Sequence, residues 1–368
     1  MEQKKTDITT NATNSANGFS VKNTPASPNA TGGRGVNYAT EKSIVENSVK
    51  KWKLVVLFSV VGILLAFCVF GAFVNPSSWK YYFNLPAVGS LQAGECRVHF
   101  LDVGQGDCTL VEFPNGQTAL IDGGPKQEDS VGYVLRYLNA LKIKKLDVVI
   151  ATHTDVDHCG GLAQILKYKK VGKVFLPKAE PFVNNEYAEY YNFLLDEDID
   201  WAYADRMTNV FNMNDCVFSI LYPYATNVGM DNSAQESNAQ SVVIWLDYHG
   251  ASVLLTGDMT TETERILMRD ESFGVFEHKG VNLSSTEVLK VSHHGSRYQT
   301  SAEFLQYLHL QTAVISCGKN NAYGHPDEET LQRLQAVYST IYRTDENGSV
   351  VVTLKKDGTH IVETRQKA

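Results

Sequence analysis

Residues 152–161 read T-H-T-D-V-D-H-C-G-G and directly follow the apolar run L-D-V-V-I-A at residues 146–151. This stretch places His153, Asp155, Asp157 and His158 close together in the chain. They cannot form a packed core, because each buried polar group would lack hydrogen-bond partners. Imidazole nitrogens and carboxylate oxygens are ligands that zinc, manganese and iron accept. We therefore expect a metal site at the end of a strand, with a solvated acidic loop as the alternative.

Six further motifs follow a fixed order, and together they resemble the motifs of the metallo-β-lactamase fold. The pattern H-x-D-x-D-H at residues 153–158 is similar to the first metal-binding motif of that fold, H-x-H-x-D-H. Asp155 replaces the middle histidine, as in the extracellular hydrolase domain of the competence protein ComEC and its stand-alone relatives. The other motifs are F-L-D-V-G-Q-G-D at 100–107, L-I-D-G-G at 120–124, S-N-A-Q-S at 237–241, L-T-G-D-M at 255–259, K-V-S-H-H-G-S at 290–296 and Y-G-H-P at 323–326.

The resemblance covers residues 95–364 and implies an α/β (α+β) fold, the four-layer αββα metallo-β-lactamase sandwich. It also implies one or two divalent metal ions. The implied metal ligands are His153, Asp155, Asp157, His158, Asp258 and His293. The residues implied to contact substrate or to support the ligands are Asp107, Asp122, Asn238, Ser241, His294 and Ser296. For Asp258 the alternative is a helix N-cap, and His293 is preferred over His294 as the ligand.

The expected site is poor in nitrogen ligands, because no histidine occurs between His158 and His249, where many relatives place one. Carboxylate-rich ligation favours harder ions, so zinc, manganese and iron are all candidates, and a β-lactamase is disfavoured. A metal-bound hydroxide would attack phosphorus in a phosphodiester. Asp157 would orient that hydroxide, and His325 would protonate the leaving group. A hydrogen-bonded loop histidine is the alternative for His325.

Three classes of function remain open. The first is a phosphodiesterase, with DNA as a candidate substrate. The second is a hydrolase of a wall phospho-ester or a lactone-like small molecule, and the third is a non-catalytic metal-binding relative. Residues 79–368 carry 25 basic and 37 acidic side chains, a net charge of −12, and an acidic body repels a phosphate backbone. The basic clusters at 142–145 and 167–170 would favour nucleic acid if they lined the active face.

The N-terminal part indicates attachment to the cell membrane. Residues 1–51 are rich in small polar side chains, which predicts a disordered cytoplasmic tail. Residues 52–76 are expected to be a transmembrane anchor, because positions 54–74 carry no charge and would form a helix about 31 Å long. Lys50, Lys51 and Lys53 precede it, so the positive-inside rule places the body outside the cell in a single-pass topology. A cleaved signal peptide is the alternative.

A tether at 77–94 leads to the body at 95–368, where strands come first and then alternate with helices. Strands are expected at 96–102, 108–113, 118–122, 146–151, 173–176, 241–247, 252–256, 287–292, 312–317 and 349–354. Helices are expected at 131–141, 161–168, 260–269, 302–308 and 328–337. The five cysteines beyond the anchor are expected to be small buried residues. Cys159 beside His158 is the one considered as a soft metal ligand.

Overall fold

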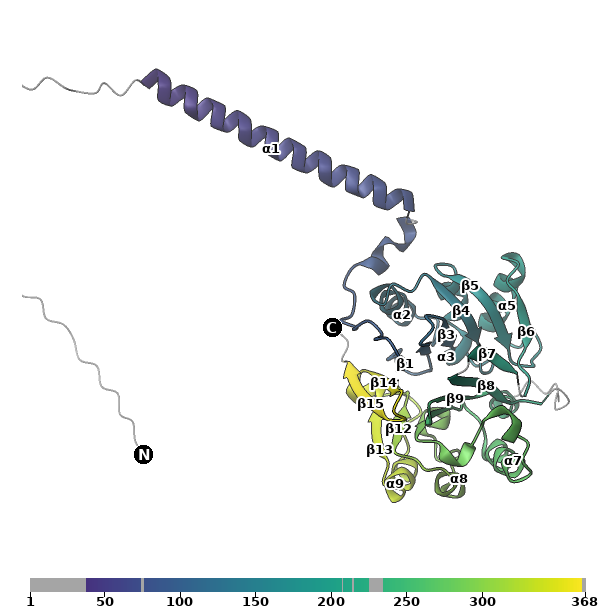
Figure 1. The fold of residues 1–368 in the computed structure, drawn as a ribbon. Coiled ribbons are helices and arrows are strands. Elements are labelled where there is room, and N and C mark those ends of the chain that lie inside the picture. Colours follow the sequence, from purple (N-terminus) through teal and green to yellow (C-terminus); the bar gives the residue numbers. More distant parts are fainter. Residues whose placement is uncertain (1–37, 74–75, 207, 214, 225–233, 366–368) are drawn as a thin grey trace, which may run out of the picture. The chain divides into compact units, whose positions relative to one another are not determined.

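The computed structural model describes residues 38–73, 76–206, 208–213, 215–224 and 234–365. The chain divides into two compact units, Met1–Ala72 and Phe73–Ala368. The first contains one long helix, α1 (Tyr38–Phe73), whose segment Glu41–Gly71 is long and apolar enough to cross a membrane (Figure 1). The helix begins inside the segment for which composition predicts disorder. Extending an existing helix fixes few residues for each new hydrogen bond, so the apolar part can carry the helix into its polar flank.

Two sheets form the centre of the second unit. The first has eight strands in the order β15-β14-β1-β2-β3-β4-β5-β6, and the second has seven in the order β13-β12-β11-β10-β9-β8-β7. The strands of the first sheet are β1 (Glu95–Phe100), β2 (Thr109–Glu112), β3 (Thr118–Ile121), β4 (Lys145–Ile150), β5 (Lys170–Leu176), β6 (Trp201–Tyr203), β14 (Ser349–Lys355) and β15 (His360–Arg365). Those of the second are β7 (Asn209–Met213), β8 (Cys216–Tyr222), β9 (Val243–Tyr248), β10 (Ala251–Leu255), β11 (Val288–Lys290), β12 (Thr312–Ile315) and β13 (Thr340–Arg343).

Helices cover the outer face of each sheet (Figure 1). Those that pack on the first sheet are α2 (Glu128–Ala140), α4 (Leu162–Leu166) and α5 (Asn185–Asp196). Those that pack on the second are α7 (Thr261–Ser272), α8 (Ala302–Tyr307) and α9 (Glu328–Ala336). The shorter helices are α3 (Val156–Cys159), α6 (Ala234–Ala239) and α10 (Thr344–Asn347), with 3-10 turns η1 (Pro76–Tyr82), η2 (Glu277–Lys279), η3 (Leu283–Ser285) and η4 (Ser292–Gly295).

Three apolar layers separate these elements. The layer between the sheets contains side chains from both inner faces, such as Val98, Phe113, Phe218 and Ile244. The other two layers lie between each sheet and its helices. Strand residues alternate between the two faces of a sheet, so a sheet that is buried on both sides reads as a nearly continuous apolar run. The predicted four-layer αββα sandwich is confirmed.

The loops that carry the motifs meet at one edge of the sandwich. In the first sheet β3 and β4 are parallel, and in the second β10 and β11 are parallel. Parallel neighbours end at the same edge, so the residues after β3 and β4, and those after β10 and β11, are brought together in pairs. A turn at 114–116 joins β2 to β3 in antiparallel register. The five body cysteines are buried and free.

Candidate metal centre

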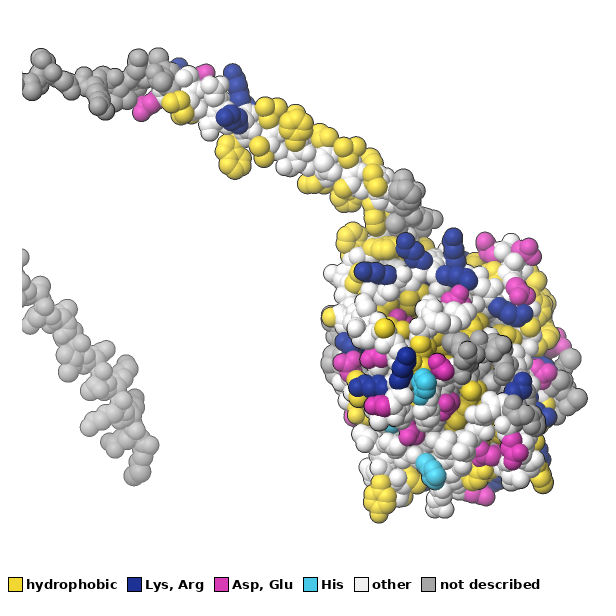
Figure 2. All heavy atoms as spheres, in the orientation of Figure 1, with side chains coloured by type: hydrophobic (Ala, Val, Ile, Leu, Met, Phe, Trp, Pro, Cys, Tyr) yellow, Lys and Arg dark blue, Asp and Glu magenta, His cyan; other side chains and the backbone are white. Residues whose placement is uncertain are grey.

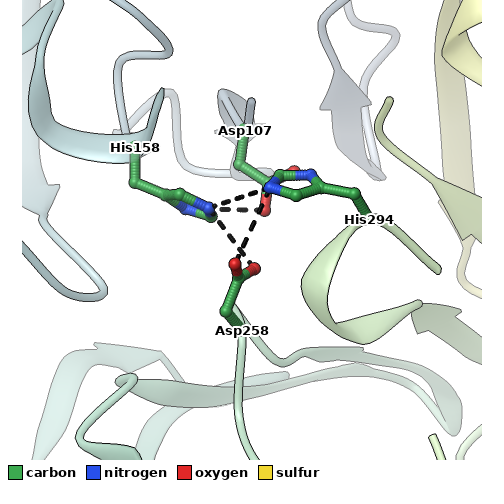
Figure 3. Close-up of side chains that lie close together, drawn as sticks. All are labelled: Asp107, His158, Asp258 and His294. Carbon is green, nitrogen blue, oxygen red and sulfur yellow. Dashed lines mark hydrogen bonds and ion pairs between the residues drawn. The ribbon is translucent and has the colours of Figure 1, made fainter. Parts of the chain in front are cut away.

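Four buried side chains converge between the edges of the two sheets: Asp107, His158, Asp258 and His294 (Figure 3). Each offers one ligand atom, and these atoms all lie within 4.8 Å of one another. Asp107 lies in the loop between β1 and β2, and His158 lies in α3 beyond β4. Asp258 follows β10, and His294 lies in η4 beyond β11. The loops after the strands of each sheet therefore contribute one carboxylate and one imidazole to this group.

The two imidazoles of this group are held through their Nδ1 atoms. His158 Nδ1 donates to Asp122 Oδ2 at 2.8 Å, and His294 Nδ1 donates to the backbone oxygen of Ser316 at 2.8 Å. Both Nε2 atoms consequently face the centre. His158 Nε2 lies 3.3 Å from His294 Nε2 and 3.3 Å from Asp258 Oδ1. Histidines that bind metals are commonly fixed in this way by a second partner on the other ring nitrogen.

The ring of His153, which lies on another side of Asp258, is also fixed through its Nδ1 atom. Its Nδ1 donates to Thr152 Oγ1 at 3.0 Å, and Thr152 Oγ1 donates in turn to Asp122 Oδ2 at 2.7 Å. Burial, and then the nearby His158, lower the pKa of His153 well below its ordinary value. The ring is therefore neutral at pH 7, with its unprotonated Nε2 directed toward Asp258.

A second group of possible ligands surrounds that nitrogen. His153 Nε2 lies 3.7 Å from Asp155 Oδ2 and 3.9 Å from Asp258 Oδ2. His293 Nε2 lies 3.7 Å from the same Asp258 oxygen, and its side chain is partly exposed. Asp258 thus faces both groups: Oδ1 lies near His158, and Oδ2 lies near His153, His293 and also His294. This is the position of a carboxylate that can bridge two cations.

Negative charge dominates the centre. Five carboxylates lie in or beside it, and one buried lysine, Lys290, offsets only part of their charge. Lys290 pairs with Asp107, lies 3.7 Å from Asp258 Oδ1 and donates to the backbone oxygen of Gly257 at 3.0 Å. The five carboxylates are Asp107, Asp122, Asp155, Asp157 and Asp258. Buried charges of one sign are costly unless they are paired or bind a metal.

The pKa values of the site reflect this imbalance. Burial lowers the pKa of His158, but Asp258, Asp122 and Asp107 raise it more, and the result lies well above the ordinary value. The pKa of His294 is raised for the same reason, against burial, mainly by Asp258 and Asp157. The carboxylates therefore favour positive charge at these two rings, which a divalent cation held by the Nε2 atoms would also supply.

The residues present fit such a cation. Among the described residues, His153 Nε2 and Asp258 Oδ1 are buried and make no hydrogen bond. Native proteins leave few buried polar atoms without a partner, and an unfilled one at a functional site points to an ion or water. A set of imidazole nitrogens and carboxylate oxygens suits zinc, manganese or iron. The centre is therefore a buried Asp/His group that can bind metal.

The backbone brings these loops close. Gly106 has φ +138°, and a Cβ atom there would lie 2.2 Å from the backbone oxygen of Asp157. Next to it, the backbone N–H of Asp107 donates to the same oxygen at 3.1 Å. His293 and His294 have φ +48° and +55°, a left-handed conformation that is strained for residues other than glycine. Such strain concentrates at functional sites, where surrounding contacts hold it in place.

The other predicted residues lie around this centre. Asp157 Oδ2 is 3.1 Å from His294 Nε2 and is partly exposed. The backbone N–H of Asp258 donates to Ser241 Oγ at 3.1 Å. Asn238, in α6, and Ser296, directly after η4, are buried. The structure therefore brings the five aspartates and Ser241 together with the histidines at 153, 158, 293 and 294. Asp107 and His294, predicted to lie near substrate, belong to the four-residue group, and His293 lies outside it.

His325 borders the centre on its open side. Its ring centroid is 5.5 Å from that of His293 and 6.4 Å from that of His294, and it stacks on the exposed ring of Tyr323. The ring is half-buried, and the loop is fixed because the His325 N–H donates to Asn321 Oδ1 at 3.0 Å. Burial, and then His293 and His294, lower the pKa of His325 below its ordinary value.

Sequence reasoning missed Lys290. The residue is the first of the K-V-S-H-H-G-S motif, and a charged side chain at the end of a buried strand was the available signal. Cys159, considered as a soft ligand, donates instead to the backbone oxygen of Thr154 at 3.2 Å. The basic clusters at 142–145 and 167–170 precede or begin β4 and β5, whereas the centre follows the other end of β4. They do not line the active face.

The fold and this centre define a metallo-β-lactamase domain, and this chain contains one: residues 101–214 match the family described as the metallo-beta-lactamase superfamily. Curated relatives of the chain are competence proteins. ComE operon protein 3 of Bacillus subtilis is 33% identical over 273 residues, which cover 70% of this chain and 33% of that protein. Recombination protein 2 of Haemophilus influenzae is 30% identical, over 74% of this chain and 30% of that protein.

A third relative, the competence protein ComA of Neisseria gonorrhoeae, is 30% identical over 72% of this chain and 33% of its own length. The chain therefore spans about a third of the length of the curated relatives it matches. The matched region corresponds in size to the body beyond α1.

Proposed function

We propose that the body is a metal-dependent hydrolase that cleaves phosphodiester bonds. The observation that carries the proposal is the buried group of Asp107, His158, Asp258 and His294, with its excess of carboxylates over Lys290. A divalent cation held there would lower the pKa of a bound water and polarise a phosphoryl oxygen. Asp258 and His153 would hold a second ion, because the buried, unpaired His153 Nε2 lies 3.9 Å from Asp258 Oδ2 on the other side of the group.

Asp157 is placed to orient the attacking water. Burial raises its pKa, but the hydrogen bond from His294 and the charges of His158 and His294 lower it more, so the carboxylate stays ionised. It is partly exposed and can therefore accept a hydrogen bond from a molecule entering the centre. Because Oδ2 already contacts His294 Nε2 at 3.1 Å, the water would be held through the other oxygen.

His325 is placed to contact the leaving group. It also lines a polar cleft of about 520 Å³ next to the centre, together with Lys319, Asn321, Arg343 and Asp345. Arg343 is held by Asp345 through two hydrogen bonds, of 2.7 and 3.1 Å. The cleft would take the part of the substrate that departs, and its mixture of charges suits a polar group.

Two observations bear on the substrate, and they point in different directions. Relatives whose names refer to competence and recombination support a nucleic acid. The acidic body, and the position of the lysine clusters away from the centre, oppose tight binding of a polyanion. We therefore propose the phosphodiester as the substrate class, with single-stranded DNA as the first polymer to test.

The test uses the full chain in detergent, stripped of metal and reloaded with zinc or manganese. Substrates are bis-p-nitrophenyl phosphate, single- and double-stranded DNA, and a simple lactone. We expect hydrolysis of at least one phosphodiester, with a loss of ~100-fold or more in Asp258→Asn. Asp247→Asn, which removes a carboxylate at the other end of β9 and β10, should retain activity. Hydrolysis of the lactone but of no phosphodiester would overturn the proposal.

A further inference from the structure

Two lysine clusters meet at one end of the body. β4 and β5 are parallel, and Lys145 pairs in register with Lys170, so the clusters at 142–145 and 167–170 lie beside each other. A cleft of about 770 Å³ is lined in part by Lys142, Lys144 and Lys145. A second, of about 460 Å³, is lined in part by the lysines at 167, 169 and 170. The metal centre follows the opposite end of β4.

Three exposed lysines of these clusters have no counter-charge among the described residues. Lys145 pairs with Asp147 at 2.8 Å, and the other cluster has one pair with a glutamate of α5. Lys142, Lys144 and Lys170 are exposed and form no ion pair with any described residue. Residues 79–368 carry 25 basic and 37 acidic side chains, so these lysines concentrate positive charge at one end of an acidic body.

The tether packs against this same end. Tyr81, the buried aromatic residue of η1, has its ring centroid 5.2 Å from that of Tyr168. Asn139 Nδ2, at the end of α2, donates to the backbone oxygen of Tyr81 at 2.8 Å. Asn139 Oδ1 accepts from Lys169 Nζ at 2.6 Å. The tether and the lysine clusters are therefore parts of one continuous surface.

Apolar side chains extend this surface. Tyr82, Phe83 and Leu85 follow directly and are 39%, 57% and 42% exposed. Figure 2 shows Lys and Arg side chains gathered over the end of the body next to the tether. Exposed aromatic side chains beside lysines are typical of protein segments at a membrane–water interface. We call residues 82–85 with Lys142, Lys144 and Lys170 the tether surface.

The length of the chain keeps the tether surface near the end of α1. Tyr81 follows Phe73, the last residue of α1, by eight positions. Even a fully extended chain of that length reaches only about 28 Å. If α1 crosses a membrane, Tyr81 therefore lies within that distance of the end of the membrane-spanning helix, and the tether surface adjoins Tyr81.

From these observations we infer that the tether surface binds an anionic bilayer. Phe83 and Leu85 enter the headgroup region, and Lys142, Lys144 and Lys170 contact lipid phosphates. The body then has a fixed orientation, with the metal centre at the far end of β4 directed away from the bilayer and toward substrate in solution. The inference rests on α1 crossing the membrane and is independent of the proposed hydrolysis.

Hydrogen exchange of the full chain in lipid nanodiscs tests this inference. Discs of neutral lipid are compared with discs that contain ~30% anionic lipid. We expect slower exchange at 82–85, 142–145 and 167–170 in the anionic discs, and loss of this protection at high salt. Each lysine near an anionic surface contributes about fivefold in binding, so Lys142→Gln/Lys144→Gln/Lys170→Gln should lower the docked-to-free ratio by on the order of 100-fold.

The matched control removes three positive charges from the helix layer of the other sheet, as Arg265→Gln/Arg269→Gln/Lys279→Gln. It should behave like the unsubstituted protein. Equal exchange in neutral and anionic discs, or equal loss of protection in both triple variants, would overturn the inference. Single-stranded DNA is added to the neutral discs as a further arm. Protection of the same segments by DNA, without protection by anionic lipid, would assign the surface to nucleic acid instead.

Discussion

The adjacent residues His293 and His294 belong to different groups of possible metal ligands. His294 Nε2 faces Asp157 and the buried group, whereas His293 Nε2 reaches only the outer oxygen of Asp258. Both residues have a left-handed backbone, so alanine would add strain to the loss of the ring. Asparagine tolerates that conformation and isolates the role of the imidazole.

We therefore expect His294→Asn to lower the affinity for the first metal ion by ~10-fold or more, and His293→Asn to have a smaller effect. Metal titration followed by isothermal calorimetry measures both, with circular dichroism to confirm the fold. A larger loss in His293→Asn would support the ligand assignment made from the sequence motif and would exclude His294 from the primary group.

Protonation of the same residues predicts a dependence on pH. The neighbouring carboxylates raise the pKa values of His158 and His294 against burial, so protons compete with a cation for the two Nε2 atoms and must be released when it binds there. Metal affinity should rise with pH above the ordinary histidine value and fall as the pH drops below it. Calorimetry in buffers of different ionisation enthalpy should detect the release of about one to two protons per ion. Binding without proton release would contradict the assignment of these rings.

At the scale of structural elements, close packing between two loops sets the geometry of the metal centre. Gly104 and Gly106 both have positive φ in the same motif, but only a Cβ at Gly106 would collide, with the backbone of Asp157. Gly104→Ala should therefore cost about 1 kcal/mol in the free energy of unfolding, from backbone strain alone. Gly106→Ala should cost about 2–3 kcal/mol and should also weaken metal binding, because the loop must move. Denaturant unfolding and metal titration measure both; equal effects would mean that the contact does not position the loop.

The sequence predicts central elements better than edges. The strands that carry motifs are apolar and buried on both faces, and β3, β4, β10 and β11 all appear where the pattern places them. β6 has three residues and β15 alternates partly buried with exposed side chains, so neither produces a strong pattern. Short and polar edge strands are common because they discourage pairing with other chains. α5, β13, β7 and the buried strand β8 were also not assigned.

The candidate site was also predicted only in part from the sequence. The loop from His153 to His158 is local in sequence, and its residue types alone indicate a metal. The contact between Asp107 and Lys290 joins residues far apart in the chain, and only the packing of the two sheets brings them together. The choice between His293 and His294 depends on backbone φ, which a pair of identical side chains cannot reveal from sequence.

At the scale of the whole molecule, α1 and its flanking charges predict how the chain lies in a cell. Lys50, Lys51 and Lys53 precede the apolar span, so the N-terminus should be cytoplasmic and the body outside. Protease added to intact cells or spheroplasts should then degrade the body. As a control, a cytoplasmic protein must survive the same treatment. Protection of the body until the cells are lysed would reverse the topology.

Central to this account is the link between the buried Asp/His group and hydrolysis. The most direct measurement follows bound metal and turnover of a phosphodiester on the same samples of full chain, as zinc or manganese is added to stripped protein. We predict no turnover without metal and a rate that rises in proportion to ions bound, up to one or two per chain, with neither binding nor turnover in Asp258→Asn. Turnover that persists in the stripped protein, or full metal occupancy without hydrolysis of any phosphodiester, would contradict the link between the buried Asp/His group and hydrolysis.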